Sequence, residues 1–164
     1  MNLQQCWNHY VKAEEMLKQG HWPEAQYLYD QVMHNMPTYI QEALQNQETK
    51  PCQFACLVNG YRDAAIAHSQ ILNHLGQQHS AFDTLNQAYA LVQFISIESS
   101  SLVNATRKLL SRTSNDLLHH ISLFCTSQRD ANWMLELELL QKAQHYFDSH
   151  NLMSHHWANE HALN

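Results

Sequence analysis

The scarcity of glycine and proline is the feature that most limits how this chain can fold. Only three glycines and three prolines occur among its 164 residues, and all six lie in the first half. A β-sandwich or barrel needs many turns, which these residues commonly form, whereas long helices need few. The sequence therefore predicts an all-α fold in which long helices are joined by short loops.

Apolar residues recur at helical spacing along the chain and divide it into about eight predicted helices. Gly20 is expected to stop the first helix, and Pro23 suits the first turn of the second, where its missing N–H costs nothing. Pro37 is expected to end that second helix, and Gly60 is a candidate for a kink in a later one. The predicted helices span residues 3–19, 22–36, 38–48, 52–75, 80–97 and 102–110, then one capped by Ser114-Asn115-Asp116 and a last one that ends near residue 149.

The length and the charge of the chain limit its function. At this length we expect one domain, residues 1–150, followed by a polar tail, residues 151–164, that is rich in His and Asn. A formal net charge of −6 gives little support to nucleic-acid binding, which needs a stripe of Lys and Arg to displace counterions. The nearest approach to such a stripe, Arg107, Lys108 and Arg112, is interpreted as the solvated side of one helix, so no nucleic-acid partner is expected.

Nothing in the sequence indicates export or membrane insertion. The first residues lack a basic stretch followed by an apolar run, and no apolar run approaches the roughly 18 residues that a membrane span requires. Cys6, Cys52, Cys56 and Cys125 are expected to be reduced thiols buried as small apolar side chains. We therefore expect a soluble, cytoplasmic protein with no membrane partner.

Two stretches of the sequence share one six-position pattern. Steps of three, four, five, four and three residues separate its members in both copies, and each position keeps the same class of residue. Small residues at the first, fourth and sixth positions would let two helices approach closely, and the glycine at the third would supply the turn between them. The first copy is Ala13, Met16, Gly20, Ala25, Tyr29 and Val32, and the second is Ser69, Leu72, Gly76, Ala81, Leu85 and Ala88.

This pattern resembles the tetratricopeptide repeat, a helical hairpin with a small residue in its first helix, a glycine at the turn and two alanines in its second helix. The turn Lys18-Gln19-Gly20-His21-Trp22-Pro23-Glu24-Ala25 is the closer match, and Pro37 lies where the closing proline of the repeat belongs. The resemblance implies a small bacterial protein family with antiparallel helical hairpins near residues 3–37 and 53–97. These would form a right-handed superhelix or bundle, with additional helices over 99–149.

The spacing of the two copies departs from the repeat family. Ala13 and Ser69 are 56 residues apart, whereas tandem repeats advance by about 34 residues. The predicted helix over 38–48 would fill the difference and separate the hairpins. The second copy also has Gln93 where the closing proline is expected. A generic antiparallel bundle of helices is the alternative interpretation of the same pattern.

The resemblance also implies where a partner would bind. In the repeat family, peptides lie in a concave groove lined by the first helices of the hairpins, and its best-known version grips a C-terminal carboxylate. Here Tyr10 and Glu14 replace the key cation and amide, so a carboxylate-tail binder is not expected. In the alternative, Trp7 and Tyr10 pack against a later helix or a dimer partner. The groove positions transfer to Trp7, Tyr10, Glu14, Leu17 and Lys18 in the first copy and to Asp63, Ile66, Gln70, Asn73 and His74 in the second.

No pattern of catalytic or metal-binding residues stands out. Cys52 and Cys56 could share a helical face, but they would supply only half of a zinc site. The glycines are too far apart to form a phosphate-binding loop. The C-terminal histidines recur mostly at steps of five, which turns successive rings away from a common face, and they are His145, His150, His155, His156 and His161. We therefore expect no enzyme activity, no metal and no cofactor.

These observations favour a protein–protein interaction module. It would be a tetratricopeptide-like adaptor, or a chaperone for one partner, that binds another protein or a peptide. A structural homo-oligomer, in the simplest case a homodimer, is the first alternative. A metal-binding helical protein that uses its C-terminal histidines is a weaker one.

Overall fold

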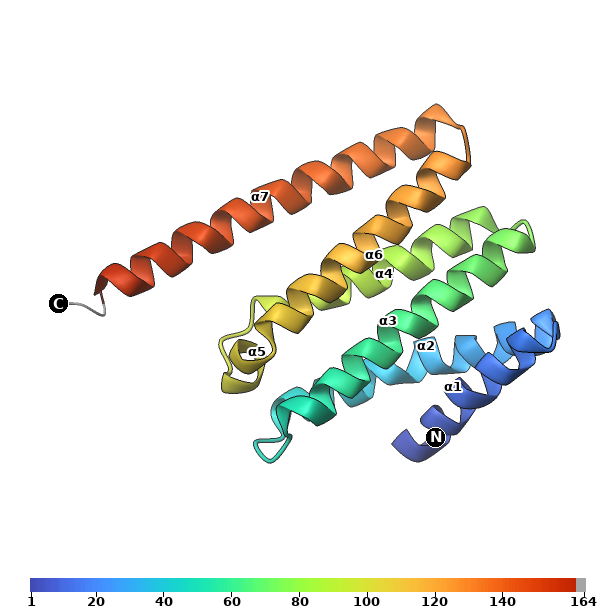
Figure 1. The fold of residues 1–164 in the computed structure, drawn as a ribbon, viewed down its shortest axis with the longest axis horizontal. Coiled ribbons are helices and arrows are strands. Elements are labelled where there is room, and N and C mark those ends of the chain that lie inside the picture. The colour runs from blue at the N-terminus through green and yellow to red at the C-terminus, as the bar shows by residue number, and fades with distance from the viewer. Residues whose placement is uncertain (162–164) are drawn as a thin grey trace. The chain divides into compact units, whose positions relative to one another are not determined.

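The all-α prediction is confirmed by a computed structural model of the chain (Figure 1). The structure describes the backbone of residues 1–161 and the side chains of residues 1–150. Over residues 1–161 it contains seven helices and no strand, where the sequence predicts about eight helices. In chain order they are α1 (Leu3–Lys18), α2 (Trp22–Gln45), α3 (Pro51–His74), α4 (Gln78–Ser96), α5 (Ser101–Ala105), α6 (Arg107–Ser127) and α7 (Ala131–His161).

The chain divides into two compact units, one over Met1–His120 and the other from Ile121 onwards. In the first unit each long helix packs against the next in sequence: α1 against α2, α2 against α3, and α3 against α4. The largest fully buried side chains of this unit come from every helix between α2 and α6 except the short α5, and they include Tyr29, Met36, Phe54, Ile71 and Ile95. Helix-on-helix packing around one continuous apolar layer therefore builds the unit.

The six-position pattern marks buried positions of these helices. Nine of its ten non-glycine members are buried, and only Met16 is partly exposed. The hydroxyl of Ser69 donates a hydrogen bond to the carbonyl oxygen of Ala81 at 2.8 Å, which joins α3 to α4 directly. Small residues therefore let these helices approach closely, as the pattern predicts.

Both glycines of the pattern adopt the left-handed conformation that the turn requires. Gly20 has φ 80° and Gly76 has φ 79°. Each turn closes in the same way, because the N–H after the glycine bonds to a carbonyl five residues earlier: His21 to Met16 at 2.9 Å, and Gln77 to Leu72 at 2.8 Å. This is the Schellman motif, and a side chain other than glycine would be strained at its left-handed position.

The prediction that Pro37 ends the second helix is wrong. α2 runs without interruption from Trp22 to Gln45 and contains Pro37, so the predicted helix over 38–48 belongs to α2. The buried stripe Tyr29, Val32, Met36 and Ile40 continues in phase across the proline. Burial of that stripe against α3 outweighs the helix-breaking effect of proline. The two predicted hairpins are thus separated by longer helices and not by an extra one.

Three other boundaries differ from the sequence-based expectation. The predicted helix over 102–110 is split, because α5 ends at Ala105 and α6 begins at Arg107. Ser114 does not cap a helix; it lies inside α6, where its hydroxyl accepts a hydrogen bond from the Gln93 side chain at 2.9 Å. α7 extends to His161, well beyond the expected end near residue 149.

In the second unit, α6 and α7 pack through aromatic and aliphatic side chains. The Phe124 and Trp133 rings meet edge to face with centroids 5.2 Å apart, and Ile121 and Leu137 are buried. Of the predicted polar tail, the backbone to His161 belongs to α7, and residues 162–164 lie outside the described part. Across the described residues, no helix combines the length and the apolar character needed to cross a membrane.

Candidate functional site

The Trp7 side chain of α1 packs against α3. Its indole lies against Gly60, in the middle of α3, and a Cβ atom at that glycine would come within 2.7 Å of the ring atom Cζ3. The helix continues through Gly60 without interruption, so this glycine does not break α3. It makes room for the indole, since any larger residue would displace the ring. Trp7 remains partly exposed beside this contact.

Tyr10 extends the aromatic surface one turn further along α1. Its ring meets Trp7 edge to face with centroids 5.7 Å apart, and it meets the buried Tyr29 of α2 in the same way at 6.3 Å. The Tyr10 hydroxyl donates a hydrogen bond to Glu14 Oε1 at 3.2 Å. Edge-to-face contacts of this kind hold aromatic rings in fixed orientations. Tyr10 is thus held in place while part of it stays open to solvent.

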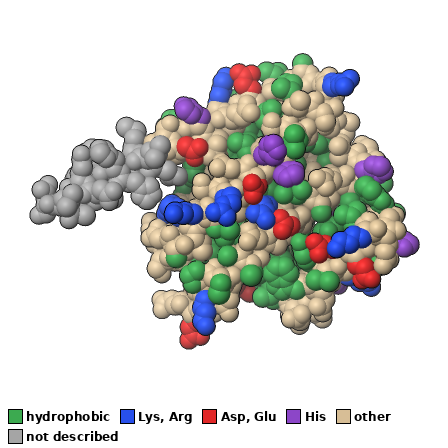
Figure 2. All heavy atoms as spheres, viewed as in Figure 1, with side chains coloured by type: hydrophobic (Ala, Val, Ile, Leu, Met, Phe, Trp, Pro, Cys, Tyr) green, Lys and Arg blue, Asp and Glu red, His purple; other side chains and the backbone are tan. Residues whose placement is uncertain are grey.

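Two carboxylates make this surface electronegative. Burial, together with the negative charges of Glu14 and Asp63, raises the pKa of the Tyr10 hydroxyl well above its ordinary value. Burial and the same two carboxylates raise the pKa of Tyr29 to about 12. Both phenols are therefore uncharged at neutral pH. We call Trp7, Tyr10, Glu14 and Asp63 the α1–α3 face; in Figure 2 hydrophobic, acidic and basic side chains lie next to one another over α1 and α3.

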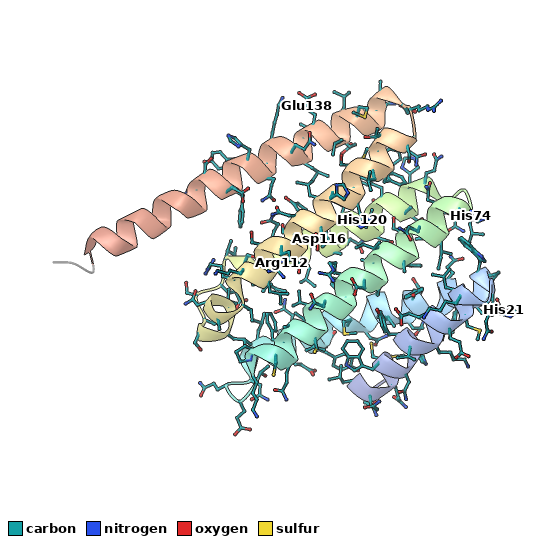
Figure 3. All side chains as sticks on the ribbon, in the orientation of Figure 1. His21, His74, Arg112, Asp116, His120 and Glu138 are labelled. Carbon is teal, nitrogen blue, oxygen red and sulfur yellow. The ribbon has the colours of Figure 1, made fainter. Side chains whose placement is uncertain are left out.

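A single arginine lies beside the carboxylate of this face that belongs to α3. The Arg62 side chain contacts Asp63 at 2.9 Å and Asp116 of α6 at 3.3 Å. Figure 3 shows Asp116 on the side of α6 that faces α3, with His120 one turn further on. Because Arg62 is shared between two carboxylates, it does not cancel the negative charge of the α1–α3 face.

The remaining predicted groove residues differ in how far their side chains are exposed. Leu17 and Ile66 are partly buried, on α1 and α3 respectively, and Lys18 and Gln70 are exposed. Asn73 lies in the last turn of α3, where its carbonyl accepts the N–H of Gly76 at 3.1 Å.

His74 is not part of the face. Its ring stacks on Trp22, at the start of α2, with centroids 4.2 Å apart. The structure therefore brings together Trp7, Tyr10, Glu14 and Asp63, and it gives His74 a packing role at the other end of α3.

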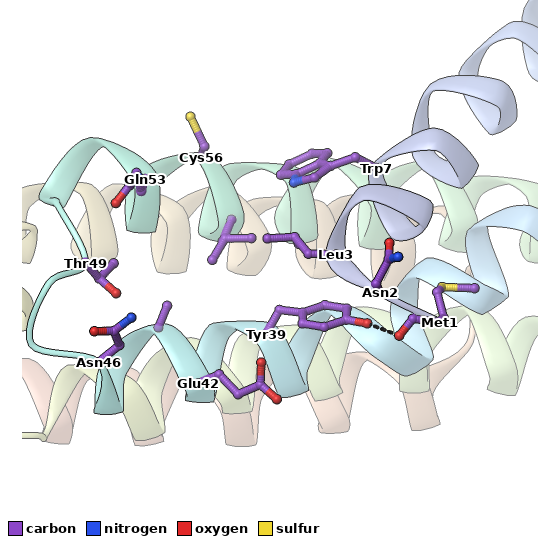
Figure 4. A pocket seen from close by; sticks show the side chains of 12 residues that line it. Met1, Asn2, Leu3, Trp7, Tyr39, Glu42, Asn46, Thr49, Gln53 and Cys56 are labelled. Carbon is purple, nitrogen blue, oxygen red and sulfur yellow. Dashed lines mark hydrogen bonds between the residues drawn. The ribbon is translucent and has the colours of Figure 1, made fainter.

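A cavity of about 790 Å³ opens next to Trp7, between the start of α1, the last turns of α2 and the start of α3 (Figure 4). Leu3, Trp7 and Leu57 give it apolar walls, and Tyr39 borders it with its hydroxyl bonded to the Met1 carbonyl. The Glu42 carboxylate lies beside the Tyr39 ring. This volume is in the range of binding sites for small molecules or for a few side chains of a partner. Its other lining residues are Asn2, Ala43, Asn46, Thr49, Gln53 and Cys56.

Sequence reasoning found Trp7 but missed the cavity. Tyr39 and Glu42 line it because α2 continues past Pro37 and extends beyond the start of α1. A signal was present in the sequence, since Ile40 follows Met36 at the same helical step that links Met36 to Val32. A stripe that continues in phase across a proline predicts one helix rather than two.

No protein-family model, no curated protein and no solved structure matches this chain.

The cysteine and histidine groups do not assemble into a metal centre in the described part of the chain. Among the residues whose side chains are described, no three His, Cys, Asp or Glu residues lie close enough to hold a metal ion. Cys6 and Cys125 are buried as expected, but Cys52 and Cys56 are exposed, which corrects the prediction for that pair. They lie in the first turns of α3, on its solvent side. His145 and His150 are exposed on α7, and the side chains of His155, His156 and His161 lie outside the described residues.

Proposed function

We propose that this chain binds a segment of another protein through the α1–α3 face and the adjoining cavity. The observation that carries the proposal is the position of Trp7, which is seated on Gly60, partly exposed, and part of the cavity wall. Partly exposed, well-supported aromatic side chains next to an apolar hollow are typical anchors for a partner chain. The protein would then act as an adaptor or as a chaperone for one partner.

The proposed arrangement is that of two tetratricopeptide-like antiparallel hairpins, α1–α2 and α3–α4. The matched glycine turns at Gly20 and Gly76 and the buried small residues of both copies support it. In this arrangement α1 and α3 are the first helices of neighbouring hairpins and line one shared surface. The free thiols Cys6, Cys52, Cys56 and Cys125 are compatible with a role in the cytoplasm.

The charge of the site indicates what the partner segment should carry. Glu14 and Asp63 border the aromatic surface and Glu42 borders the cavity, while Arg62 is shared between two carboxylates. Opposite charges across an interface favour association and select partners. We therefore propose a segment with apolar side chains for the cavity, flanked by Lys or Arg.

Replacing Trp7 by alanine should weaken binding of the partner segment about 30-fold, the effect of losing about 2 kcal/mol at an interface anchor. The partner would be captured with the purified chain, and a synthetic peptide from its bound region would be titrated by fluorescence anisotropy. The same peptide should bind less tightly as salt is raised, because salt screens the carboxylates of the site.

Phe94 supplies the matched control, because it is an aromatic residue that is 56% exposed on α4. Phe94→Ala should leave the affinity unchanged, and circular dichroism should show that both variants keep their helix content. Equal affinity of the Trp7→Ala variant and the unmodified chain would exclude this face as the binding site.

A homo-oligomer is a second candidate, favoured by one observation on α7. Leu135 and Leu139 are 57% and 62% exposed on successive turns of this helix. Two exposed leucines at this spacing form the start of an apolar stripe that a second copy could cover. Light scattering on the samples used for the titration separates the two candidates. A monomer at micromolar concentration rejects the oligomer, and a dimer that dissociates in a Leu135→Asn, Leu139→Asn variant supports it.

A further inference from the structure

A second, smaller cavity lies between α2, α3 and α4, away from Trp7. Its volume is about 250 Å³. His68 of α3 borders it and is only 5% exposed, yet neither ring nitrogen has a hydrogen-bond partner within the described part of the chain. A buried polar group without a partner costs folding free energy, so such groups normally meet a protein atom, a water or a ligand. The other lining residues are Asp30, Met33, His34, Pro37, Tyr61, Thr84 and Gln87.

The lining of this cavity carries one carboxylate and several groups that can accept a hydrogen bond. Asp30 contributes a carboxylate, and the Thr84 hydroxyl already donates its proton to the Ser80 carbonyl at 2.9 Å, which leaves its oxygen free to accept. Pro37 has no N–H, so it cannot make the usual helical bond to the Met33 carbonyl four residues earlier. Met33 and Pro37 both border the cavity, and no Lys or Arg among the described residues does.

Acidification should destabilise the fold through His68. Burial lowers the pKa of this imidazole, although the charge of Asp30 opposes the shift. The folded state therefore binds the His68 proton less readily than the unfolded state does, so the stability from this group is present above the ordinary histidine pKa and is lost below it. Denaturant unfolding should give a lower free energy of unfolding near pH 5 than near pH 7.

The groups that line the cavity with His68 come from α2, α3 and α4. α2 contributes Asp30 and His34, α3 contributes Tyr61, whose pKa is raised by burial to about 12, and the α4 residues Thr84 and Gln87 do not titrate. His68→Phe should reduce the pH dependence without abolishing it, because burial also lowers the pKa of His120 on α6. Replacing the exposed His145 by Phe should leave the pH dependence unchanged. An unaltered slope in His68→Phe would assign the loss to another group.

We infer that this cavity binds a primary ammonium group, which would donate hydrogen bonds to the Asp30 carboxylate, a ring nitrogen of His68 and the Met33 carbonyl. An ammonium carries three donors and one positive charge, which complements the Asp30 carboxylate and the two other acceptor atoms. The ammonium could belong to a free small amine or to a lysine side chain of a bound protein. The inference does not depend on the α1–α3 face.

The probes that test this inference are n-butylammonium and Nα-acetyl-lysine amide, with n-butanol as the uncharged counterpart. Their binding would be followed by NMR of the chain labelled with ¹⁵N at its histidine rings. We expect saturable shifts of the His68 ring signals with a dissociation constant on the order of 1 mM. Asp30→Asn should weaken this binding about threefold to fivefold, because the ion pair with this exposed carboxylate is lost. Asp83→Asn, which changes an exposed carboxylate of α4 outside the cavity, should leave it unchanged.

Each outcome has a definite meaning. Binding of n-butylammonium alone identifies a small amine as the ligand, and binding of the lysine derivative identifies a lysine side chain as an acceptable source. The inference is overturned if neither ammonium shifts the His68 signals, if n-butanol binds equally well, or if Asp30→Asn binds as tightly as the unmodified chain.

Discussion

Replacing Tyr29 by alanine should lower the free energy of unfolding by about 3–5 kcal/mol, the usual cost of deleting a large aromatic side chain from a core. Tyr29 is 2% exposed and is one of the largest fully buried side chains of the chain. It lies on the buried stripe of α2, and its ring supports Tyr10 of the α1–α3 face. Deleting it would therefore leave a cavity beneath the proposed binding surface as well as removing apolar contacts.

Two further tyrosine variants of α2 test whether the loss of stability comes from removing the buried Tyr29 ring. Tyr27 is also a tyrosine of α2, but it is 64% exposed, so Tyr27→Ala should change the free energy of unfolding by no more than about 0.5 kcal/mol. Tyr29→Phe keeps the ring and should cost about 1 kcal/mol or less. Denaturant unfolding followed by circular dichroism measures all three variants. A loss below 1 kcal/mol in Tyr29→Ala would show that Tyr29 is not a core residue.

The local features of the fold could be predicted because each depends on a few neighbouring residues. The turns at Gly20 and Gly76 follow from a glycine at a helix end, and the buried stripe of each helix follows from helical spacing. The six-position pattern also predicts that the two turns are alike, because the same small residues flank the glycine in both copies. The burial of nine of its members confirms the packing reason given for it.

Features that depend on distant parts of the chain could not be predicted from such local rules. The sequence predicts a helix over 52–75 with Gly60 as a candidate kink. It does not predict that Gly60 makes room for the Trp7 ring, which comes from a helix more than fifty residues earlier. The sequence likewise predicts that Pro37 ends a helix, because proline is locally unfavourable inside one. In both cases tertiary packing, which a local propensity does not contain, decided the conformation.

Only part of the candidate site could be predicted from the sequence. Trp7, Tyr10 and Glu14 lie on one side of α1 at helical spacing, so their proximity follows from the sequence. The proximity of Asp63 and the cavity lined by Tyr39 and Glu42 depends on how α1, α2 and α3 pack. The ammonium cavity was not predicted at all, because it combines a proline, a buried histidine and residues from three helices.

Replacing Pro37 by alanine should raise the free energy of unfolding by about 1–3 kcal/mol. Alanine restores the helical hydrogen bond to the Met33 carbonyl, and proline within a helix is about 3 kcal/mol less favourable than alanine. The gain is reduced by about 0.4–1 kcal/mol because alanine leaves the unfolded chain more freedom than proline does. Some contacts of the partly buried proline ring are lost as well. The measurement is denaturant unfolding followed by circular dichroism.

Pro51 provides the matched control, because it is the first residue of α3, where its missing N–H breaks no helical bond. Pro51→Ala carries the same gain of freedom in the unfolded chain, so it should lower stability slightly while Pro37→Ala raises it. The difference between the two variants isolates the cost of proline inside α2. If Pro37→Ala is no more stable than Pro51→Ala, the Met33 carbonyl already has a partner, and the proline causes no strain.

Pro37→Ala should also change ammonium binding in the second cavity. A Met33 carbonyl that is bonded within α2 can no longer accept a hydrogen bond from an ammonium in the cavity, so Pro37→Ala should weaken n-butylammonium binding while it strengthens the fold. Natural chains often keep a locally unfavourable residue where it exposes a group for binding. Stabilisation with unchanged ammonium affinity would mean that Asp30 and His68 hold the ammonium without the Met33 carbonyl. Loss of affinity together with stabilisation would mean that Pro37 opens α2 for binding at a cost in stability.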